Sequence, residues 1–290
     1  MKTNKLILGT VQFGLPYGIN NISGQIKIET AFKILATAEK SGVQYLDTAA
    51  AYGKSEEIIG QYLSKSKTSN FKIITKFSFQ NGATCEQSLL HSLEKLMVDC
   101  VDTIMFHSYA DYYKHKSVIS DFVKTYKNKL FHNLGVSVYT NQEVDLIIDD
   151  INVNIVQLPF NLLDNNTLRL ASLKKLKNAG KVVHVRSAFL QGLFIKELSQ
   201  FPESLSDLQQ PIQFLKSIAA ENHVSIQKLA FSYACNNLLI DNILIGVDNL
   251  KQLHENLSFL DFELNQGTLS EIDSIKIENE SLLNPSKWKI

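Results

Sequence analysis

The chain has 290 residues, of which 44% are hydrophobic and 20% are charged. This composition is typical of a globular protein and excludes a wholly disordered chain. The 29 basic and 29 acidic residues give zero net charge, which argues against a nucleic-acid partner because such proteins concentrate positive charge.

Several classes of site and location are disfavoured by what the sequence lacks. No segment approaches the ~20 apolar residues that cross a bilayer, and no signal peptide is evident, so we expect a cytoplasmic protein without a membrane partner. The histidines and the three cysteines show no spacing typical of metal ligands or disulfides, so no metal site is predicted. Only Arg169 and Arg186 are arginines, which restricts where a bidentate phosphate contact can form.

Eight short apolar segments rich in β-branched residues predict strands. In chain order they are Leu6–Thr10, Tyr45–Thr48, Lys72–Lys76, Thr103–His107, Asn133–Val138, Ile155–Pro159, Val182–Ser187 and Asn242–Gly246. Amphipathic stretches between them predict helices. These include Thr30–Lys40, Ser55–Leu63, Glu86–Met97, Glu143–Ile148 and Leu170–Asn178.

The regular alternation of strand and helix predicts a parallel sheet, because each strand–helix–strand unit returns the chain to the same end of the sheet. Eight such units favour a single (β/α)8 TIM barrel over residues 1–290, since barrels of about 250 residues fold as one domain. A doubly wound open sheet is the alternative. No Gly-x-Gly-x-x-Gly motif follows any predicted strand, which favours the barrel.

Long segments interrupt the pattern at two places. Phe13–Gln25 and Ala188–Asn222 both follow strands, so we expect extended loops on the C-terminal face, where barrels hold their active sites. Near the C-terminus, Thr268 and Glu271 have the spacing of a capping box and predict the start of a last helix. The tail Ser281–Ile290 is interpreted as a packed strap in preference to a flap over the barrel mouth.

Polar side chains end three consecutive predicted strands. Asp47, Lys76 and His107 are separated by about one strand–helix unit each, and adjacent strands lie ~4.8 Å apart, so the three side chains can converge. Tyr52 follows Asp47 closely and can reach the same point. The alternative is that each residue has an ordinary structural role. The coincidence of three strand ends and the nearby Tyr52 favours a shared site over this alternative.

The chemistry of these four residue types suits proton donation to a carbonyl group. A lysine beside a tyrosine stabilises the phenolate, and we expect it to lower a tyrosine pKa that starts near ~10. Asp47 would hold and balance Lys76, and His107 would donate a hydrogen bond to the substrate oxygen. Such a set can act as a general acid during reduction.

Six sequence motifs extend this pattern over nearly the whole chain. They are LDTAAAYGKSE (Leu46–Glu56), ITKF (Ile74–Phe77), DTIMFHS (Asp102–Ser108), GVSVY (Gly135–Tyr139), VQLPFN (Val156–Asn161) and IGVDNLKQLHEN (Ile245–Asn256). In this order they resemble the aldo-keto reductases. The resemblance implies that Tyr52 is the general acid, that Lys76 and Asp47 adjust its acidity, and that His107 orients the carbonyl.

The resemblance also implies a nicotinamide dinucleotide bound across the barrel mouth without a Rossmann fold. Ser137 and Gln157 match positions at the nicotinamide, Glu255 and Asn256 match positions at the adenine, and a loop after the seventh strand covers the pyrophosphate. The full set of expected cofactor residues is Gly9, Thr10, Asp47, Ser137, Gln157, Arg186, Ser187, Leu190, Gly192, Gly246, Gln252, Glu255 and Asn256.

The sequence departs from the family pattern at the nicotinamide and adenine ends. Val138 replaces an Asn, and Arg186 stands where an aromatic residue often stacks. Gly246 and Gln252 stand where a Lys and an Arg often bind the 2′-phosphate of NADPH, a contact worth ~1.5–3 kcal/mol. On family grounds NADPH is the predicted cofactor, with NADH as the alternative.

The substrate is expected to be a small carbonyl compound. Phe13, Tyr17 and Tyr109 are the candidate substrate contacts, because aromatic walls with a few polar groups suit a sugar-like ligand. The segment TVQFGLPYGI (Thr10–Ile19) resembles a subgroup associated with surface-polysaccharide or sugar metabolism. A keto-sugar or a sugar aldehyde is therefore the first hypothesis.

Two other functions are compatible with the sequence. In the first, Lys76 forms a Schiff base, as in barrel aldolases. In the second, the barrel binds a cofactor as a regulatory module and has little turnover.

Overall fold

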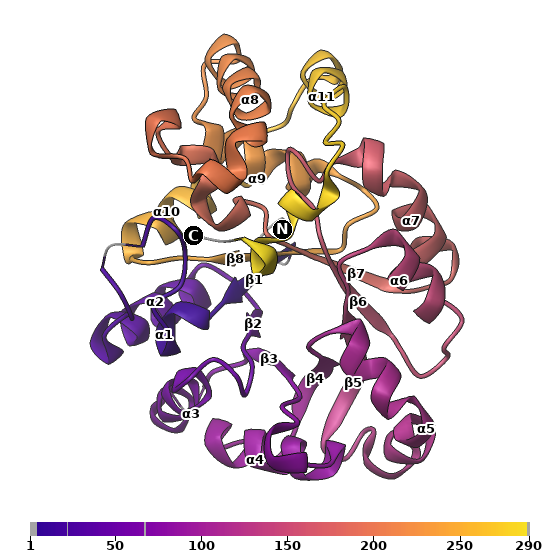
Figure 1. The fold of residues 1–290 in the computed structure, drawn as a ribbon. Helices are drawn as coiled ribbons and strands as arrows, with labels where there is room; N and C mark the ends of the chain where they lie inside the picture. Colours follow the sequence, from indigo (N-terminus) through magenta and orange to yellow (C-terminus); the bar gives the residue numbers. More distant parts are fainter. Residues whose placement is uncertain (1–4, 22, 67, 289–290) are drawn as a thin grey trace.

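The computed structural model describes residues 5–21, 23–66 and 68–288. Eight parallel strands close into a barrel in which each strand pairs with its neighbours in chain order (Figure 1). The strands are β1 (Leu6–Gly9), β2 (Tyr45–Asp47), β3 (Lys72–Lys76), β4 (Val101–Phe106), β5 (Phe131–Ser137), β6 (Ile155–Pro159), β7 (Val182–Arg186) and β8 (Asn242–Gly246). The predicted (β/α)8 barrel is confirmed, and the open doubly wound sheet is excluded by the pairing of β1 with β8.

Helices surround the barrel and cover its outer face (Figure 1). Each buries an apolar face, as α2 does through Ala31, Ile34, Leu35 and Ala38. The helices are α1 (Val11–Gly14), α2 (Ile28–Lys40), α3 (Ser55–Lys65), α4 (Cys85–Leu96), α5 (Tyr109–Tyr126), α6 (Asn141–Ile147), α7 (Asn166–Asn178), α8 (Gln209–Glu221), α9 (Ile226–Asn236), α10 (Leu250–Ser258) and α11 (Gln266–Asp273). Within the described residues, none of them is long and apolar enough to cross a membrane.

The barrel interior changes from apolar to polar along the strand direction. A cluster of Ile7, Ile74, Met105 and Ile155 fills the middle, with Tyr45 and Leu244 packed against it. Two residues further along their strands, toward the C-terminal ends, lie Asp47, Lys76, Ser137 and Gln157, which are all buried. Side chains of a strand alternate between its two faces, so these polar residues form the next inward layer, at the C-terminal face.

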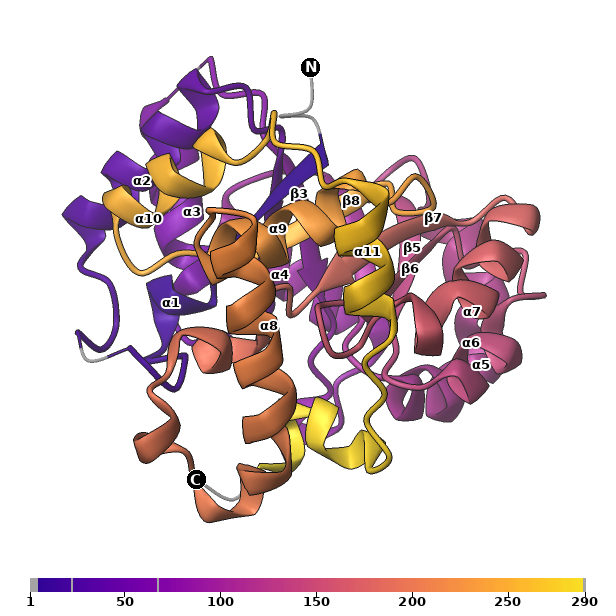
Figure 2. The ribbon, with the colours of Figure 1, turned by 90° about the horizontal axis from the view of Figure 1, so that it is seen from above.

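Two long segments lie at this C-terminal end. In Figure 2 the N-terminal end of β1 lies at one end of the barrel, and the chain after β7 lies at the other with the C-terminal tail. Short 3₁₀ turns form most of the chain between β7 and α8: η3 (Leu190–Ile195), η4 (Leu198–Gln200) and η5 (Glu203–Leu208). The extended loop expected after β7 is therefore confirmed, with a compact conformation.

The predicted capping box at the last helix is wrong. Helix α11 is capped by Asn265, whose side-chain oxygen accepts a hydrogen bond from the Thr268 backbone N–H at 2.9 Å. Thr268 is buried and donates its hydroxyl to the Asn222 side chain at 2.8 Å. The helix starts earlier than predicted because the asparagine upstream accepts the free N–H groups of the first turn.

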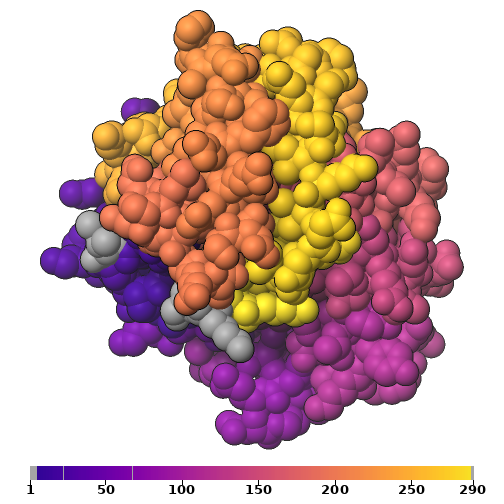
Figure 3. Space-filling model, turned by 45° about the horizontal axis from the view of Figure 1, so that its top comes forward, coloured from indigo at the N-terminus to yellow at the C-terminus, as the bar shows by residue number. Residues whose placement is uncertain are grey.

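The tail both packs on the protein and reaches the barrel mouth. It contains the turns η6 (Glu280–Leu283) and η7 (Pro285–Lys287), and Leu283 is buried in the core. Pro285 and Ser286 line the central cavity, so the interpretation as a strap alone is incomplete. Figure 3 shows this yellow segment lying beside the orange segment that contains α8. Residues 289–290 of the predicted tail lie outside the described residues.

Candidate active site

A cavity of about 520 Å³ opens at the C-terminal ends of the strands. Its volume is in the range typical of sites for small molecules and cofactors. Most of the residues predicted for the site line it: Gly9, Thr10, Tyr17, Asp47, Tyr52, Lys76, His107, Ser137, Gln157, Arg186, Ser187, Gly192, Gly246, Gln252, Glu255 and Asn256.

Three predicted contact residues do not line the cavity. Leu190 and Phe13 are fully buried in the hydrophobic core. Leu190 belongs to the loop after β7, at the start of η3, and Phe13 belongs to α1. Tyr109 is half-buried and packs against the rings of Tyr112 and Tyr113 on its own helix. Apolar packing therefore accounts for all three side chains.

Lys76 and Asp47 form a buried ion pair at the centre of the site. Both residues are 1% exposed, and the Lys76 ammonium also donates to the Thr48 carbonyl at 2.9 Å. The other carboxylate oxygen of Asp47 accepts from Gln157 Nε2 at 3.0 Å. Burial lowers the pKa of Lys76, but Asp47 and Tyr52 raise it more, so the net pKa is raised. The lysine is therefore held as a cation.

Tyr52 is positioned by a close approach between two backbone segments. It lies in the turn between β2 and α3, and its carbonyl oxygen would be 1.7 Å from a Cβ atom at Gly14. Gly53, which has a φ of +53°, would place a Cβ atom 2.5 Å from the Gly14 oxygen. Two glycines are therefore required for α1 to support the turn that carries Tyr52.

The Tyr52 ring lies between the other functional groups. Lys76 Nζ is 5.1 Å from its ring centroid, and the His107 ring is 5.7 Å away in an edge-on arrangement. Burial raises the pKa of Tyr52, while Lys76 and Arg186 lower it. Burial has the largest effect, so the pKa is raised overall. Lys76 thus lowers the pKa of Tyr52 as predicted, but the expected net decrease is not observed because burial outweighs the lysine.

His107 is neutral in this environment. Burial, followed by the positive charges of Lys76 and Arg186, lowers the pKa of His107 to about 3. A neutral imidazole has one N–H donor and one acceptor nitrogen. His107 can thus donate a hydrogen bond to an oxygen in the cavity without carrying a charge.

Arg186 lies at the end of β7 and forms part of the cavity wall. Its guanidinium is 4.0 Å from the centroid of the Tyr139 ring and donates to Ser137 Oγ at 3.3 Å and to the Val138 carbonyl at 3.2 Å. The stacking on Tyr139 is a cation–π contact that holds the side chain flat. Arg186 therefore places a positive charge beside the positions predicted to contact a nicotinamide.

The opposite side of the cavity is acidic. Asp248 follows β8, and Glu255 and Asn256 lie on α10; all three line the cavity. Asp248 accepts from Gln252 Nε2 at 3.2 Å and donates its backbone N–H to Gln252 Oε1 at 2.7 Å. Its second carboxylate oxygen is buried without a hydrogen-bond partner.

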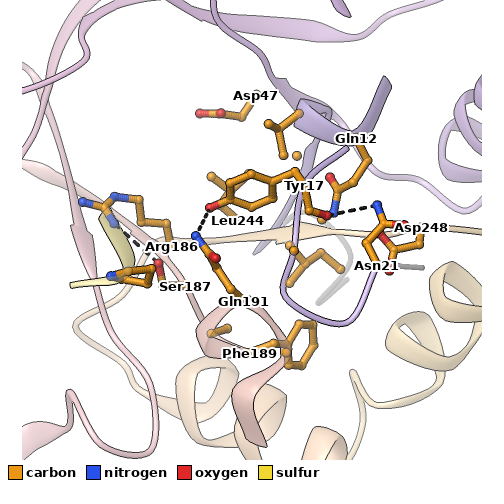
Figure 4. A pocket seen from close by; sticks show the side chains of 18 of the residues that line it. Gln12, Tyr17, Asn21, Asp47, Arg186, Ser187, Phe189, Gln191, Leu244 and Asp248 are labelled. Atoms are coloured by element: carbon orange, nitrogen blue, oxygen red, sulfur yellow. Dashed lines mark hydrogen bonds between the residues drawn. The ribbon is translucent and has the colours of Figure 1, made fainter. Parts of the chain in front are cut away.

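Two loops meet across the mouth of the cavity. The Tyr17 hydroxyl accepts from Gln191 Nε2 at 2.8 Å (Figure 4). Asn20 donates to the Gly192 carbonyl at 2.6 Å. Ser187, Leu190, Gln191 and Gly192 all have positive φ angles. The loop after β7 is thus bent sharply and held against the loop after β1.

Sequence reasoning missed two residues of the cavity wall that matter for its chemistry. Gln191 lies in a loop whose conformation depends on contacts with residues about 170 positions away. Asp248 lies within the motif after β8, between Gly246 and Gln252, which stand where the family often has a Lys and an Arg. Its position one residue before Asn249, which caps α10, was the available signal, because the residues around a helix start often face a ligand.

Comparison with known proteins establishes the relationship that the motifs indicated. The sequence profile described as "Aldo/keto reductase family" matches residues 5–277. The chain belongs to the aldo/keto reductase family. This membership confirms the predicted resemblance and implies an oxidoreductase that uses NAD(P)H to reduce carbonyl groups.

Individual relatives are distant. The chain is 23% identical to an NAD/NADP-dependent indole-3-acetaldehyde reductase of Schizosaccharomyces pombe, with 82% of this chain and 81% of that protein covered. It is 24% identical to an L-galactose dehydrogenase of Arabidopsis thaliana, with 97% and 94% covered. Among solved structures, an aldo-keto reductase from Bacillus halodurans in its holo form matches with a TM-score of 0.77 at 17% identity, covering 95% of this chain and 94% of that one. The structural match supports the fold.

Proposed function

We propose that this protein reduces the carbonyl group of a small aldehyde or ketone to an alcohol, with Tyr52 as the proton donor. The observation that carries the proposal is the convergence of Asp47, Tyr52, Lys76 and His107 on one wall of the cavity. Their buried ion pair and close ring contacts supply a proton donor, a charge that stabilises its conjugate base, and a neutral hydrogen-bond donor. NADPH or NADH supplies the hydride when bound.

Each of the four residues has a separate task in the proposed reaction. His107 donates a hydrogen bond to the carbonyl oxygen and orients it. Tyr52 transfers its hydroxyl proton to that oxygen as negative charge develops on it. Lys76 stabilises the phenolate that remains, and Asp47 fixes Lys76 in place. The raised pKa of Tyr52 keeps the phenol protonated at neutral pH, which suits the reductive direction.

The cavity fits an elongated polar cofactor. Ser137 and Gln157 lie beside the four residues and would hold the nicotinamide, while Glu255 and Asn256 would hold the adenosine. Buried side-chain oxygens of Gln12 and Asp248 are without a hydrogen-bond partner near this second end. Unpartnered buried polar atoms are rare in folded proteins, so a ligand that supplies donors there is consistent with the structure.

For the substrate we propose a keto-sugar or a sugar aldehyde. The part of the cavity that is not assigned to the cofactor has aromatic walls and several hydrogen-bond donors. They come from Tyr17, Tyr139, Arg186 and Gln191. A polar-faced, ring-shaped carbonyl compound uses both features. The Arabidopsis relative is named as a dehydrogenase of L-galactose, which agrees with this class.

The Schiff-base alternative is disfavoured by the environment of Lys76. An amine must be neutral to attack a carbonyl, whereas Asp47 and Tyr52 hold Lys76 as a cation in spite of its burial. Borohydride trapping of a substrate adduct at Lys76 would instead support this alternative.

The direct test of the proposed function is consumption of NADPH and of NADH with a panel of aldoses, keto-sugars, aliphatic aldehydes and aromatic aldehydes. We expect saturable oxidation of the cofactor with at least one polar carbonyl compound. Tight cofactor binding with no oxidation across the panel would point to the regulatory module and contradict the proposal.

A further inference from the structure

The cavity has opposite charges at its two ends. Of the described residues that line it, the cations are Lys76 and Arg186, both at the end where Tyr52 and His107 lie, and Asp47 balances the charge of Lys76 there, so that Arg186 supplies the excess positive charge. The carboxylates of Asp248 and Glu255 lie at the other end. Figure 4 shows Arg186 and Asp248 on opposite sides of the cavity. The end proposed to receive the adenosine is therefore the acidic one.

Asp248 also forms hydrogen bonds with the side chain at the position where the family often has an arginine. Gln252 stands at the position where the family often has an arginine, and both polar atoms of its amide are hydrogen-bonded to Asp248. A phosphate that accepts from the second Nε2 hydrogen of Gln252 would lie beside the Asp248 carboxylate, which accepts the first. Gln252 is therefore held next to a negative charge, which disfavours its contact with an anion.

The neighbouring lysine does not supply the missing charge to the cavity. The Lys251 side chain is 85% exposed, lies 3.8 Å from Glu255 and points to solvent rather than lining the cavity. Gly246 has no side chain, and the space beside it is taken by Gln12, whose amide atoms lie 2.8–2.9 Å from the position of a Cβ atom. Of the described residues at this end, none brings a cation to the cavity surface.

These contacts match a ribose hydroxyl and oppose a phosphate. A carboxylate accepts hydrogen bonds from the hydroxyls of an adenosine ribose, whereas a 2′-phosphate requires cations and N–H donors. The Asp248 oxygen that is buried without a partner can accept such a hydroxyl. A phosphate in the same place would meet the half-buried Asp248 carboxylate, where repulsion is weakly screened. Glu255 adds a weaker repulsion, because its side chain is 50% exposed and lies 3.8 Å from Lys251.

We infer that this chain selects NADH over NADPH, with Asp248 and Glu255 as the residues that reject the 2′-phosphate. The inference rests on the proposed function, which places the adenosine between β8 and α10, and it reverses the preference expected from the family. Asp248 has two roles in it: it accepts the ribose hydroxyl and it binds Gln252.

The test measures binding rather than turnover. Dissociation constants for NADH and NADPH are determined by calorimetry on the full-length wild-type protein, on Asp248→Asn, on Glu255→Gln and on the double variant. We expect NADH to bind wild type at least 10-fold more tightly. The double variant should bind NADPH at least 10-fold more tightly than wild type does, and NADH less tightly, because the carboxylate that accepts the ribose hydroxyl is lost. Asp261→Asn, which removes an exposed charge that does not line the cavity, should alter neither constant.

A second pair of ligands locates the effect. 5′-AMP and 2′,5′-ADP differ only by the 2′-phosphate, so the same preference for the unphosphorylated compound should appear with them, and the double variant should reduce it. Equal or tighter binding of NADPH by the wild type would overturn the inference and leave the proposed reductase intact. Failure of both dinucleotides to bind would instead overturn the proposed function.

Discussion

The behaviour of Tyr52 depends on the balance between burial and neighbouring charges. The sequence motifs predicted that Lys76 lies beside Tyr52, and from the lysine charge alone we expected a lowered pKa for Tyr52. A sequence pattern can show which charged residues come together. It carries little information about how much water the site excludes. The structure shows that burial has the larger effect and raises the pKa of Tyr52, so Lys76 and Arg186 limit the rise rather than reverse it.

Removal of Lys76 should destabilise the fold as well as stop turnover. Lys76→Met leaves the buried Asp47 carboxylate with Gln157 as its remaining side-chain donor. Loss of one partner of a buried pair costs about 3–5 kcal/mol, and we expect a decrease of that order in the free energy of unfolding in urea. Lys76→Met/Asp47→Asn removes both charges and should recover part of the loss. Equal stability of Lys76→Met and the wild type would contradict the assigned ion pair.

Arg186 should affect the pH dependence of the proposed reaction. Its positive charge lowers the pKa of Tyr52, so Arg186→Met should raise that pKa. Reduction requires the protonated phenol, and its rate falls as pH rises through the pKa. The alkaline limb of the kcat profile should therefore move to higher pH in Arg186→Met, while Lys175→Met on the surface leaves it in place. A limb that moves to lower pH would refute the assignment.

At the scale of elements, apolar periodicity predicted all eight strands, with ends that differ from the observed ones by at most two residues. It did so because a barrel strand buries its side chains on both faces and reads as a continuous apolar run. The pattern was less informative where polar atoms decide an element's start. Asn265 rather than Thr268 caps α11, and the two residue types are both good caps, so local sequence alone could not distinguish them.

The turn that carries Tyr52 is a second feature that required the structure. Gly14→Ala would place a Cβ atom 1.7 Å from the Tyr52 carbonyl oxygen, so the turn must move. A displacement of about 1 Å at a catalytic group can lower turnover ~100-fold, and we expect a decrease of at least 10-fold in kcat with the fold retained by circular dichroism. In the control Gly267→Ala the new atom approaches only the Asn265 side chain, at 3.1 Å. Unchanged kcat in Gly14→Ala would show that Tyr52 is not positioned by this contact.

For the whole molecule, the alternation of elements and the motifs were sufficient to predict a barrel and to bring most site residues to one face. They did not predict which residues near the cavity pack into the protein interior and therefore do not line the cavity. Phe13, Leu190 and Tyr109 were expected at the cavity because of their positions in the chain, yet Phe13 and Leu190 are buried in the core and Tyr109 packs against rings of its own helix. An apolar side chain in a loop near a site can either line the cavity or pack into the hydrophobic core, and the sequence does not distinguish these two environments.

The barrel interior should make stability dependent on pH. Burial lowers the pKa of His184 to about 4, whereas an exposed histidine in the unfolded chain has a pKa near ~6.5. Above pH ~6.5 the histidine is neutral in both states and its burial does not oppose folding. As pH falls from ~6.5 toward 4, the unfolded chain binds a proton that the folded protein does not, and the free energy of unfolding decreases by about 3 kcal/mol. Urea unfolding at pH 7.5 and 5.0 should therefore show lower stability at pH 5.0, with a smaller difference in His184→Leu. An unchanged difference in that variant would contradict the buried, neutral state of His184.

The central claim is that Tyr52 donates the proton in carbonyl reduction, and Tyr52→Phe tests it most directly. This substitution removes one hydroxyl and retains the ring that contacts Lys76 and His107. Turnover with an accepted carbonyl substrate and the dissociation constant of the reduced cofactor are measured on the same preparation. The account predicts a fall in kcat of at least ~100-fold with the dissociation constant changed by less than about twofold. Full turnover in Tyr52→Phe would contradict it.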